Sequence, residues 1–215
     1  MRKSLFLLTA AGTLAACATA AATSPAPANE QAAVDPSVIE SGTYTTDPAH
    51  TLVEWRVSHF GFNDYFGLFG DAEGTLELDA DNIASSSVDI RLPITSLATV
   101  SSGLRDHMLR AGADGGEPDF FGPDPDDARF VSTSVTRTGD TTANITGTLT
   151  LNGRTAPVTI AAELSGSGDN PMSNRATIGF HGTTTLMRSE WGLDYALPAI
   201  GDAVELDITV AFEKD

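Results

Sequence analysis

The chain of 215 residues contains a single cysteine, Cys17, so no disulfide can form within it. Lysine is also scarce, since only Lys3 and Lys214 occur. Lysine and arginine together number 12 against 29 acidic residues, which gives a formal net charge of −17. Such a charge excludes nucleic acid as a partner, because phosphate backbones require basic surfaces. Stability must come from a hydrophobic core under an acidic, well-solvated surface.

The apolar runs are too short for a transmembrane helix, which needs roughly 20 apolar residues. The longest opens the chain: residues 5–14 follow Arg2 and Lys3, and the segment ends in LAAC at Cys17. A basic start, a short apolar run and small residues predict an export signal of the lipoprotein type. We expect cleavage to remove residues 1–16 and Cys17 to carry the acyl chains. The alternative is an ordinary secretory signal that is cut after Ala20.

Residues 17–41 join the predicted lipidated cysteine to the rest of the chain. They are rich in alanine, proline, serine and threonine without a strand or helix period, which predicts a flexible tether. The folded domain would then cover residues 42–215. Because Ala18 replaces the aspartate that retains lipoproteins in the inner membrane, we predict an outer-membrane anchor facing the periplasm. A soluble periplasmic protein and an inner-membrane anchor are the alternatives.

Helical periodicity is nearly absent and is confined to residues 104–110, whereas alternation of apolar and polar residues dominates the folded part. The clearest example is the segment 204–212, where every second residue is apolar. Comparable apolar faces occur at Val53-Trp55-Val57, Leu76-Leu78, Val88-Ile90-Leu92, Ile145-Leu149-Leu151, Val158-Ile160-Ala162-Leu164 and Ile178-Phe180. Asn152-Gly153 predicts a type I′ hairpin turn between two of them. The pattern predicts an all-β protein of about eight antiparallel strands, either a barrel or a sandwich.

Motifs typical of catalysis and of metal binding are missing. The chain has no Gly-x-Ser-x-Gly elbow, no His-Glu-x-x-His pair and no phosphate-binding glycine loop. The four histidines match no short metal-ligand spacing; they are His50, His59, His107 and His181. We therefore predict neither a catalytic residue nor a metal site.

Several short motifs, taken in order, resemble the YceI-like family. They are Tyr44 to His59 with Asp47 and His50, Phe66-Gly67-Leu68-Phe69 with Gly74, Arg105-Asp106-His107-Met108-Leu109, Phe120-Phe121 with Phe130, Gly147 to Gly153, and Arg188 to Leu193. The resemblance covers about residues 43–212. It implies an antiparallel eight-stranded lipocalin-like barrel with a short helix and an apolar central tunnel. Members bind long isoprenoid chains such as polyprenyl quinones, which implies a binding protein and not an enzyme, with no cofactor.

A tunnel of this kind needs many apolar side chains and few polar ones. The candidates for its lining or gate are Trp55, Val57, Phe66, Phe69, Ile90, Phe120, Phe121, Phe130, Ile178, Phe180 and Trp191. Arg105, Asp106 and His107 are candidates for contacts with a ligand headgroup at the rim, or for fixing the helix to the barrel. The aromatic, glycine-rich segment 60–69 is expected to cap an opening or to meet lipid; a packed surface loop is the alternative.

The leading hypothesis is a membrane-anchored protein that sequesters or shuttles a polyisoprenoid in the periplasm. Two other classes stay open: a structural or interaction barrel filled by its own side chains, and a hydrolase or isomerase that acts on an amphiphile through His107 and Asp106. The spacer 111–118 is longer than is usual in the family and Gly122 replaces an aspartate, so the entrance loop is expected to differ. The expected partners are an isoprenoid lipid and a membrane. The oligomeric state is open, with a homodimer among the options.

Overall fold

The computed structural model describes residues 34–215. The predicted signal peptide, Cys17 and the tether as far as residue 33 lie outside the described residues. Ten strands are present in the described part: β1 Gly42–Thr46, β2 Leu52–His59, β3 Asn63–Phe69, β4 Glu73–Leu78, β5 Ser87–Leu92, β6 Ala128–Arg137, β7 Thr142–Leu151, β8 Arg154–Asp169, β9 Ala176–Met187 and β10 Ile200–Lys214. Among residues 34–215 there is one α-helix, α1, which spans Ser102–Met108. Short 3-10 helices cover Pro36–Val38, Pro48–His50, Ile83–Ser85, Ile94–Ser96, Ala113–Gly115 and Arg188–Trp191.

The strands close into a barrel. In the order β1-β4-β5-β6-β7-β8-β9-β10 each strand pairs with the next, and β1 also pairs with β10. All of these pairings are antiparallel. The result confirms the predicted eight-stranded antiparallel barrel with a short helix. The remaining strands, β2 and β3, form a hairpin that extends the sheet.

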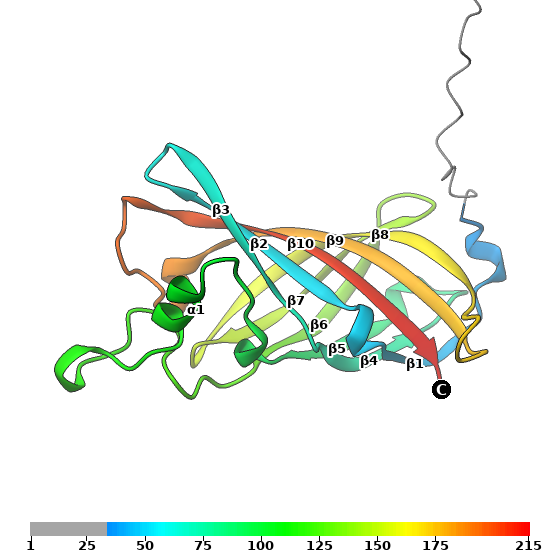
Figure 1. Ribbon diagram of the computed structural model, residues 1–215. Helices are drawn as coiled ribbons and strands as arrows, with labels where there is room; N and C mark the ends of the chain where they lie inside the picture. The colour runs from blue at the N-terminus through cyan, green and yellow to red at the C-terminus, as the bar shows by residue number, and fades with distance from the viewer. Residues whose placement is uncertain (1–33) are drawn as a thin grey trace, which may run out of the picture. The chain divides into compact units, whose positions relative to one another are not determined.

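Strand β10 has two partners along one of its edges. Its C-terminal part pairs with β1, where Lys214 lies opposite Tyr44, and its N-terminal part pairs with β2, where Leu206 lies opposite Trp55. The β2–β3 hairpin therefore diverges from the ring at the end of the barrel where α1 lies (Figure 1). Closure is tight at the other end, where β1 also pairs with β4.

The alternation read in the sequence sorts side chains between the inside and the outside of the barrel. Asn152 and Gly153 both have positive φ, as the predicted type I′ turn requires. The described part contains three groups of buried residues. The first contains Trp55, Phe69, Ile94, Leu97, Met108 and Ala128, the second Tyr44, Leu76, Leu164, Ile178 and Phe212, and the third Phe130, Val158, Leu186 and Trp191.

The chain packs against the barrel before the first strand begins. Val34 and Ile39 contact the second group of core residues. The hydroxyl of Tyr44 donates to the carbonyl oxygen of Glu40 at 2.7 Å, and Lys214 Nζ lies 2.6 Å from the carboxylate of Glu40. The described part of the expected tether, residues 34–41, thus contains a 3-10 turn and core contacts.

A buried arginine fixes the connection between β9 and β10. Arg188 is 6% exposed, and its guanidinium donates to the carbonyl oxygens of Gly201, Leu193 and Ile200. Burial lowers the pKa of Arg188, while the charge of Asp202 opposes that shift. The carboxylate of Asp202 in turn accepts hydrogen bonds from the backbone N–H and the hydroxyl of Ser189. The loop before β10 is therefore held by a charged group that the protein must keep compensated.

Gly147 lets the ring of Phe130 approach strand β7 closely. A methyl group on Gly147 would come within 2.6 Å of Phe130 Cζ and closer still to the carbonyl oxygen of Val131. We predict that Gly147→Ala destabilises the fold by about 1–3 kcal/mol, because strand β6 and the ring must shift. Gly166→Ala is the matched control, since nothing lies within 4 Å of that position. Urea unfolding checks both, and equal midpoints would show that Phe130 moves aside without cost.

The second prediction concerns pH. Hydrogen bonds from Ser189, assisted by the charge of Arg188, lower the pKa of Asp202. A carboxyl with a lowered folded-state pKa stabilises the fold above its unfolded-state pKa of about 3.9, and that contribution is lost as the pH falls through the folded-state value. Asp202→Asn should therefore lower the free energy of unfolding at pH 7, and the deficit should shrink below about pH 4.

Asp207→Asn is the matched control for this prediction, because Asp207 lies on the same strand with its side chain exposed. Thermal unfolding of the three proteins between neutral and acid pH supplies the comparison. A deficit for Asp202→Asn that stays constant with pH would contradict the proposed role of its charge.

Candidate functional site

The interior of the barrel is not filled by its side chains. Three cavities of about 550, 200 and 150 Å³ follow one another inside the described residues. We call them the helix-side, middle and far cavities. The helix-side and middle cavities share wall residues such as Val53, Leu149 and Leu206, and the middle and far cavities share Leu76, Ile145 and others. The shared walls make them sections of one apolar tunnel.

Partial exposure of inward-facing aliphatic residues gives independent evidence of this empty space. Large apolar residues that line the middle cavity remain partly exposed, namely Ile90, Ile145, Ile160, Phe180, Leu206, Ile208 and Val210. A filled barrel would bury such side chains fully, because protein interiors are close-packed. Their accessible surface faces a void that the chain itself does not occupy.

Most of the candidate lining residues do meet in the tunnel. The helix-side cavity is lined by Trp55, Val57, Phe69, Phe120, Phe121 and Trp191. The middle cavity is lined by Ile90, Phe130 and Phe180. Ile178 lines none of the three; it is buried beside Phe212 in the second group of core residues.

Phe66 was expected in the tunnel, and the structure places it on the outer face of β3. It lies opposite Arg56 and is 59% exposed, whereas its neighbours Tyr65 and Phe69 line the helix-side cavity. The reason is the pleat of the strand: residues an odd number of positions apart point to opposite faces. Phe66 therefore does not line the tunnel.

Polar groups gather at the helix-side end of the tunnel. His107, on α1, reaches the helix-side cavity, and its Nε2 forms a hydrogen bond of 2.7 Å with Asp119 Oδ2. Arg110 Nη2 lies 3.2 Å from the same oxygen, and these two partners, His107 first, lower the pKa of Asp119. The edges of Phe120 and Tyr195 meet His107 with ring centroids 5.4 and 5.2 Å apart.

The other two rim candidates have different roles. The guanidinium of Arg105 donates to the carbonyl oxygens of Leu97 and Thr95, so it fixes α1 to the segment after β5. Asp106 is exposed, and His107 pairs with Asp119 in place of Asp106. The acid/base pair that an enzyme would require at Asp106 and His107 is therefore not formed.

Sequence reasoning missed four residues of this end: Arg110, Asp119, Arg188 and Tyr195. Arg188 and Tyr195 line the helix-side cavity, and Asp119 holds His107. All four lie outside the strands and outside α1, where no period reveals which way a side chain points. Asp119 was the one of the four whose residue type suggested a partner for His107, but the sequence does not show that the two side chains meet.

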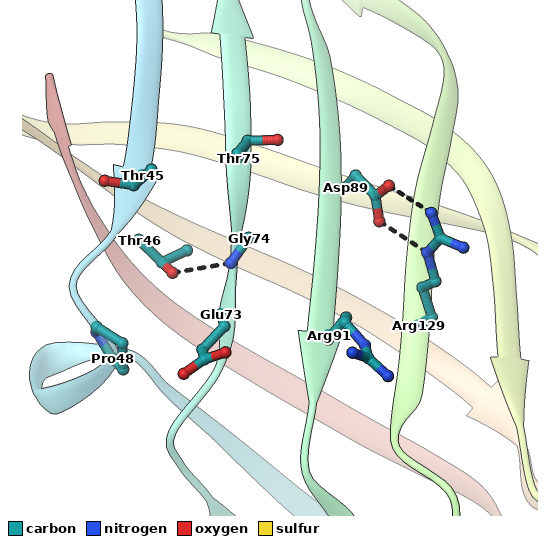
Figure 2. A pocket seen from close by; sticks show the side chains of 9 residues that line it. All are labelled: Thr45, Thr46, Pro48, Glu73, Gly74, Thr75, Asp89, Arg91 and Arg129. Atoms are coloured by element: carbon teal, nitrogen blue, oxygen red, sulfur yellow. Dashed lines mark hydrogen bonds and ion pairs between the residues drawn. The ribbon is translucent and has the colours of Figure 1, made fainter. Parts of the chain in front are cut away.

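The outside of the barrel carries a larger hollow, of about 720 Å³, across β1, β4, β5 and β6 (Figure 2). It is an open groove lined by hydroxyl and charged groups. Arg129 Nε and Nη2 donate to both carboxylate oxygens of Asp89 at 2.9 and 2.6 Å, and Arg91 pairs with Asp127 at 3.4 Å. Both of its arginines are already paired with carboxylates and the groove is open to solvent, so the tunnel is the better candidate site.

Among residues 34–215, no group of three or more metal-ligating side chains occurs. In the same part of the chain, no helix is long and apolar enough to cross a membrane.

Known proteins resemble this chain over most of its folded part. The YceI-like domain family matches residues 44–212. A UPF0312 protein of Pseudomonas putida is 35% identical over 162 residues, which is 75% of this chain and 80% of the relative. A UPF0312 protein of Pseudomonas aeruginosa is 36% identical with the same coverage.

Solved structures share the fold. BcnA of Burkholderia cenocepacia superposes with a TM-score of 0.61 at 18% identity, over 77% of this chain and 98% of that one. A polyisoprenoid-binding domain from Saccharophagus degradans superposes with a TM-score of 0.56 at 11% identity, over 82% of this chain and all of that one. The resemblance read from the motifs is thereby confirmed, and the chain belongs to the YceI-like domain family.

Proposed function

We propose that this protein binds a long-chain polyisoprenoid, such as a polyprenyl quinone or a related amphiphile, and carries it between apolar environments. The observation that carries the proposal is the unfilled tunnel, whose aliphatic walls stay partly exposed inside the barrel. A cavity lined in this way stabilises an apolar chain and offers little to a small polar substrate.

The length of the tunnel fits a long chain. Between its first and last lining residues, β10 contributes six side chains to the helix-side and middle cavities, namely Ile200, Val204, Leu206, Ile208, Val210 and Phe212. At roughly 3.3 Å per residue this stretch measures about 40 Å along the strand, and a strand tilt of about 40° leaves about 30 Å along the barrel axis. This is about the thickness of the hydrocarbon core of a bilayer.

The distribution of polar groups favours an amphiphile with its headgroup at the helix-side end. His107, Arg188 and Tyr195 face that section, while the middle cavity is lined almost entirely by apolar side chains. A hydroxyl or carbonyl group is stabilised where hydrogen-bonding partners are available, and a hydrocarbon tail where they are not. The tail would therefore occupy the middle cavity, since the far cavity is again lined in part by polar side chains such as Arg137 and Asp140.

The energetic need for a carrier follows from the ligand's chemistry. Each CH₂ group moved from lipid into water costs about 0.8 kcal/mol, so a chain of tens of carbons does not leave a bilayer unaided at a useful rate. An apolar tunnel removes most of that cost. The Saccharophagus degradans domain, which shares this fold, is described as polyisoprenoid-binding, and that description supports the same ligand class here.

We also propose that the chain is a lipoprotein held at the outer membrane and facing the periplasm. The support is the sequence LAAC at Cys17 behind a short apolar run with a basic start. Several acyl chains on one residue give lasting anchorage. A carrier held beside a membrane would meet its ligand at short range.

A variant that fills the tunnel tests the ligand proposal. Leu206 lies in the wall shared by the helix-side and middle cavities and is partly exposed to the void. Leu206→Trp should weaken binding of added ubiquinone at least about tenfold, because the indole takes the place of the isoprenoid chain. The same variant should unfold at an unchanged or higher temperature, since it fills an existing cavity.

Thr209→Trp is the matched control, because Thr209 lies on the outer face of the same strand. Native mass spectrometry after ubiquinone addition measures occupancy, and organic extraction of protein from a bacterial host identifies any lipid that copurifies. If the wild-type protein carries no lipid and also rejects ubiquinone and undecaprenol, the barrel is a structural module and the ligand proposal fails.

A separate prediction concerns the anchor. Cys17→Ser should abolish incorporation of radiolabelled palmitate and release the protein from the membrane fraction, because the acylated side chain is lost. Thr19→Ser, two positions away, is the control and should keep the label. A wild-type protein whose mass shows an unlipidated N-terminus at Ala21 would instead demonstrate cleavage of an ordinary secretory signal.

A further inference from the structure

Three phenylalanines on one hairpin are left in solvent. Phe60, Phe62 and Phe66 lie on or between β2 and β3 and are 53%, 89% and 59% exposed. The other phenylalanines of the described residues do not appear among the exposed large apolar side chains. The hairpin extends past the ring of strands at the end where α1 lies (Figure 1). Such a concentration of exposed aromatic surface marks an interaction site.

The backbone at the tip is held in an uncommon conformation. Phe60 has a φ of 55° and Gly61 a φ of 69°, and the turn is closed by a hydrogen bond from the N–H of Phe62 to the carbonyl oxygen of His59. Glycine or asparagine would adopt this φ at lower cost than phenylalanine. The N–H of Phe60 donates to the carbonyl oxygen of Ala199 at 2.9 Å, which ties the tip to the segment before β10. Phe60 thus combines an unfavourable backbone conformation with an aromatic side chain that is exposed to solvent.

The exposed surface is continuous with the tunnel. Phe60 and Tyr195 each line the helix-side cavity and are also exposed, Tyr195 by 42%. An apolar path therefore runs from the tip of the hairpin past these two rings into the cavity. A ligand that followed this path would meet aromatic surface before water.

We propose that the tip of the β2–β3 hairpin inserts into the surface of a lipid bilayer and places the mouth of the tunnel against the hydrocarbon region. This inference rests on the proposed lipid-carrier function. Continuity with the tunnel supports a bilayer as the occupant, as does the charge of the segment: residues 58–70 contain one charged side chain, Asp64. A second copy fits less well, because each chain carries a formal charge of −17 and contact would bring like charges together.

The acidic residues at this end of the barrel also predict a preference for bilayers of neutral lipid over anionic ones. The segment between α1 and β6 lies at the same end and contains acidic residues, among them Asp114, Glu117, Asp124 and Asp126. An anionic surface would repel them, so the insertion is driven by apolar burial and opposed by negative lipid. Binding should therefore be stronger to phosphatidylcholine vesicles than to vesicles that also contain phosphatidylglycerol.

The test uses a local reporter in the full chain, with Cys17→Ser in every sample so that no acyl chain contributes. Phe62→Trp places an indole at the tip, and Met172→Trp places one in the β8–β9 connection, where Met172 is 93% exposed. That connection lies near the other end of β10, since Asn170 bonds to Glu213. With phosphatidylcholine vesicles, the emission of Phe62→Trp should shift to the blue and be quenched by brominated lipid, and that of Met172→Trp should not.

A second variant pair separates docking from ligand binding. Phe62→Ser with Phe66→Ser removes two exposed rings that line no cavity, and Met172→Ser is its control. The double variant should take up ubiquinone from phosphatidylcholine vesicles at least about tenfold more slowly, since burial of even one phenylalanine ring is worth that factor. Its occupancy at equilibrium should equal that of the wild type.

The other possible results of these two experiments distinguish bilayer docking from ligand binding. If the indole at residue 62 shows no shift while ubiquinone still binds, docking is wrong and the carrier function stands. If the indole shifts but ubiquinone never binds, the bilayer contact stands without the carrier function. If sedimentation shows a dimer that the double serine variant dissolves, and vesicles cause no shift, the hairpin is a contact between copies and the proposal is overturned.

Discussion

One edge of strand β10 pairs with two different strands, and the shape of the barrel depends on this division. A strand that paired with one partner over its whole length would close the barrel equally at both ends. Here β10 pairs with β1 near its C-terminus and with β2 over its N-terminal part, and only β1 continues the ring through β4. The strands of the ring are consequently joined closely at one end and diverge at the other end, where α1 and the loops cover the gap.

The helix-side cavity and the polar groups occur at this second end. Loops and a helix cover it, and these tolerate polar side chains better than the inner face of a strand does.

An unfilled tunnel is costly, because cavity surface forgoes the contacts that close packing provides. The protein offsets this cost by tight packing elsewhere. Gly147 allows the ring of Phe130 to lie against β7, Trp191 is almost fully buried, and Arg188 satisfies three carbonyl oxygens of the loop that leads into β10. These contacts hold the walls in place without occupying the space between them. A barrel whose side chains met at its axis would need none of this compensation, so the arrangement favours a site for a ligand.

Strand residues were more predictable than loop residues, and the reason is physical. Once Trp55 and Phe69 are assigned to the inside, alternation assigns Val57 to the inside too, and the structure agrees. The same rule places Phe66 outside, so a strict count along β3 would have excluded it from the lining.

No comparable rule exists for the helix end and the loops. The pairing of His107 with Asp119, and the position of Tyr195 beside them, depend on how three separate segments fold over the open end. Sequence left two roles open for Arg105, a headgroup contact or fixing the helix to the barrel, and its hydrogen bonds to carbonyl oxygens of its own chain correspond to the second.

The position of the exposed hairpin relative to the tunnel bears on how a carrier of this kind would work. Exposure of an isoprenoid chain to water costs about 0.8 kcal/mol for each CH₂ group, so the barrier to transfer depends on the length of chain that is in water at one time. A mouth held away from the bilayer would expose many groups at once. A mouth whose rim already contacts the hydrocarbon region would expose few, because each group leaving the lipid meets Phe60 or Tyr195 next. One structural feature, the divergence of β2 and β3 from the ring, supplies both the size of the cavity and its access to lipid.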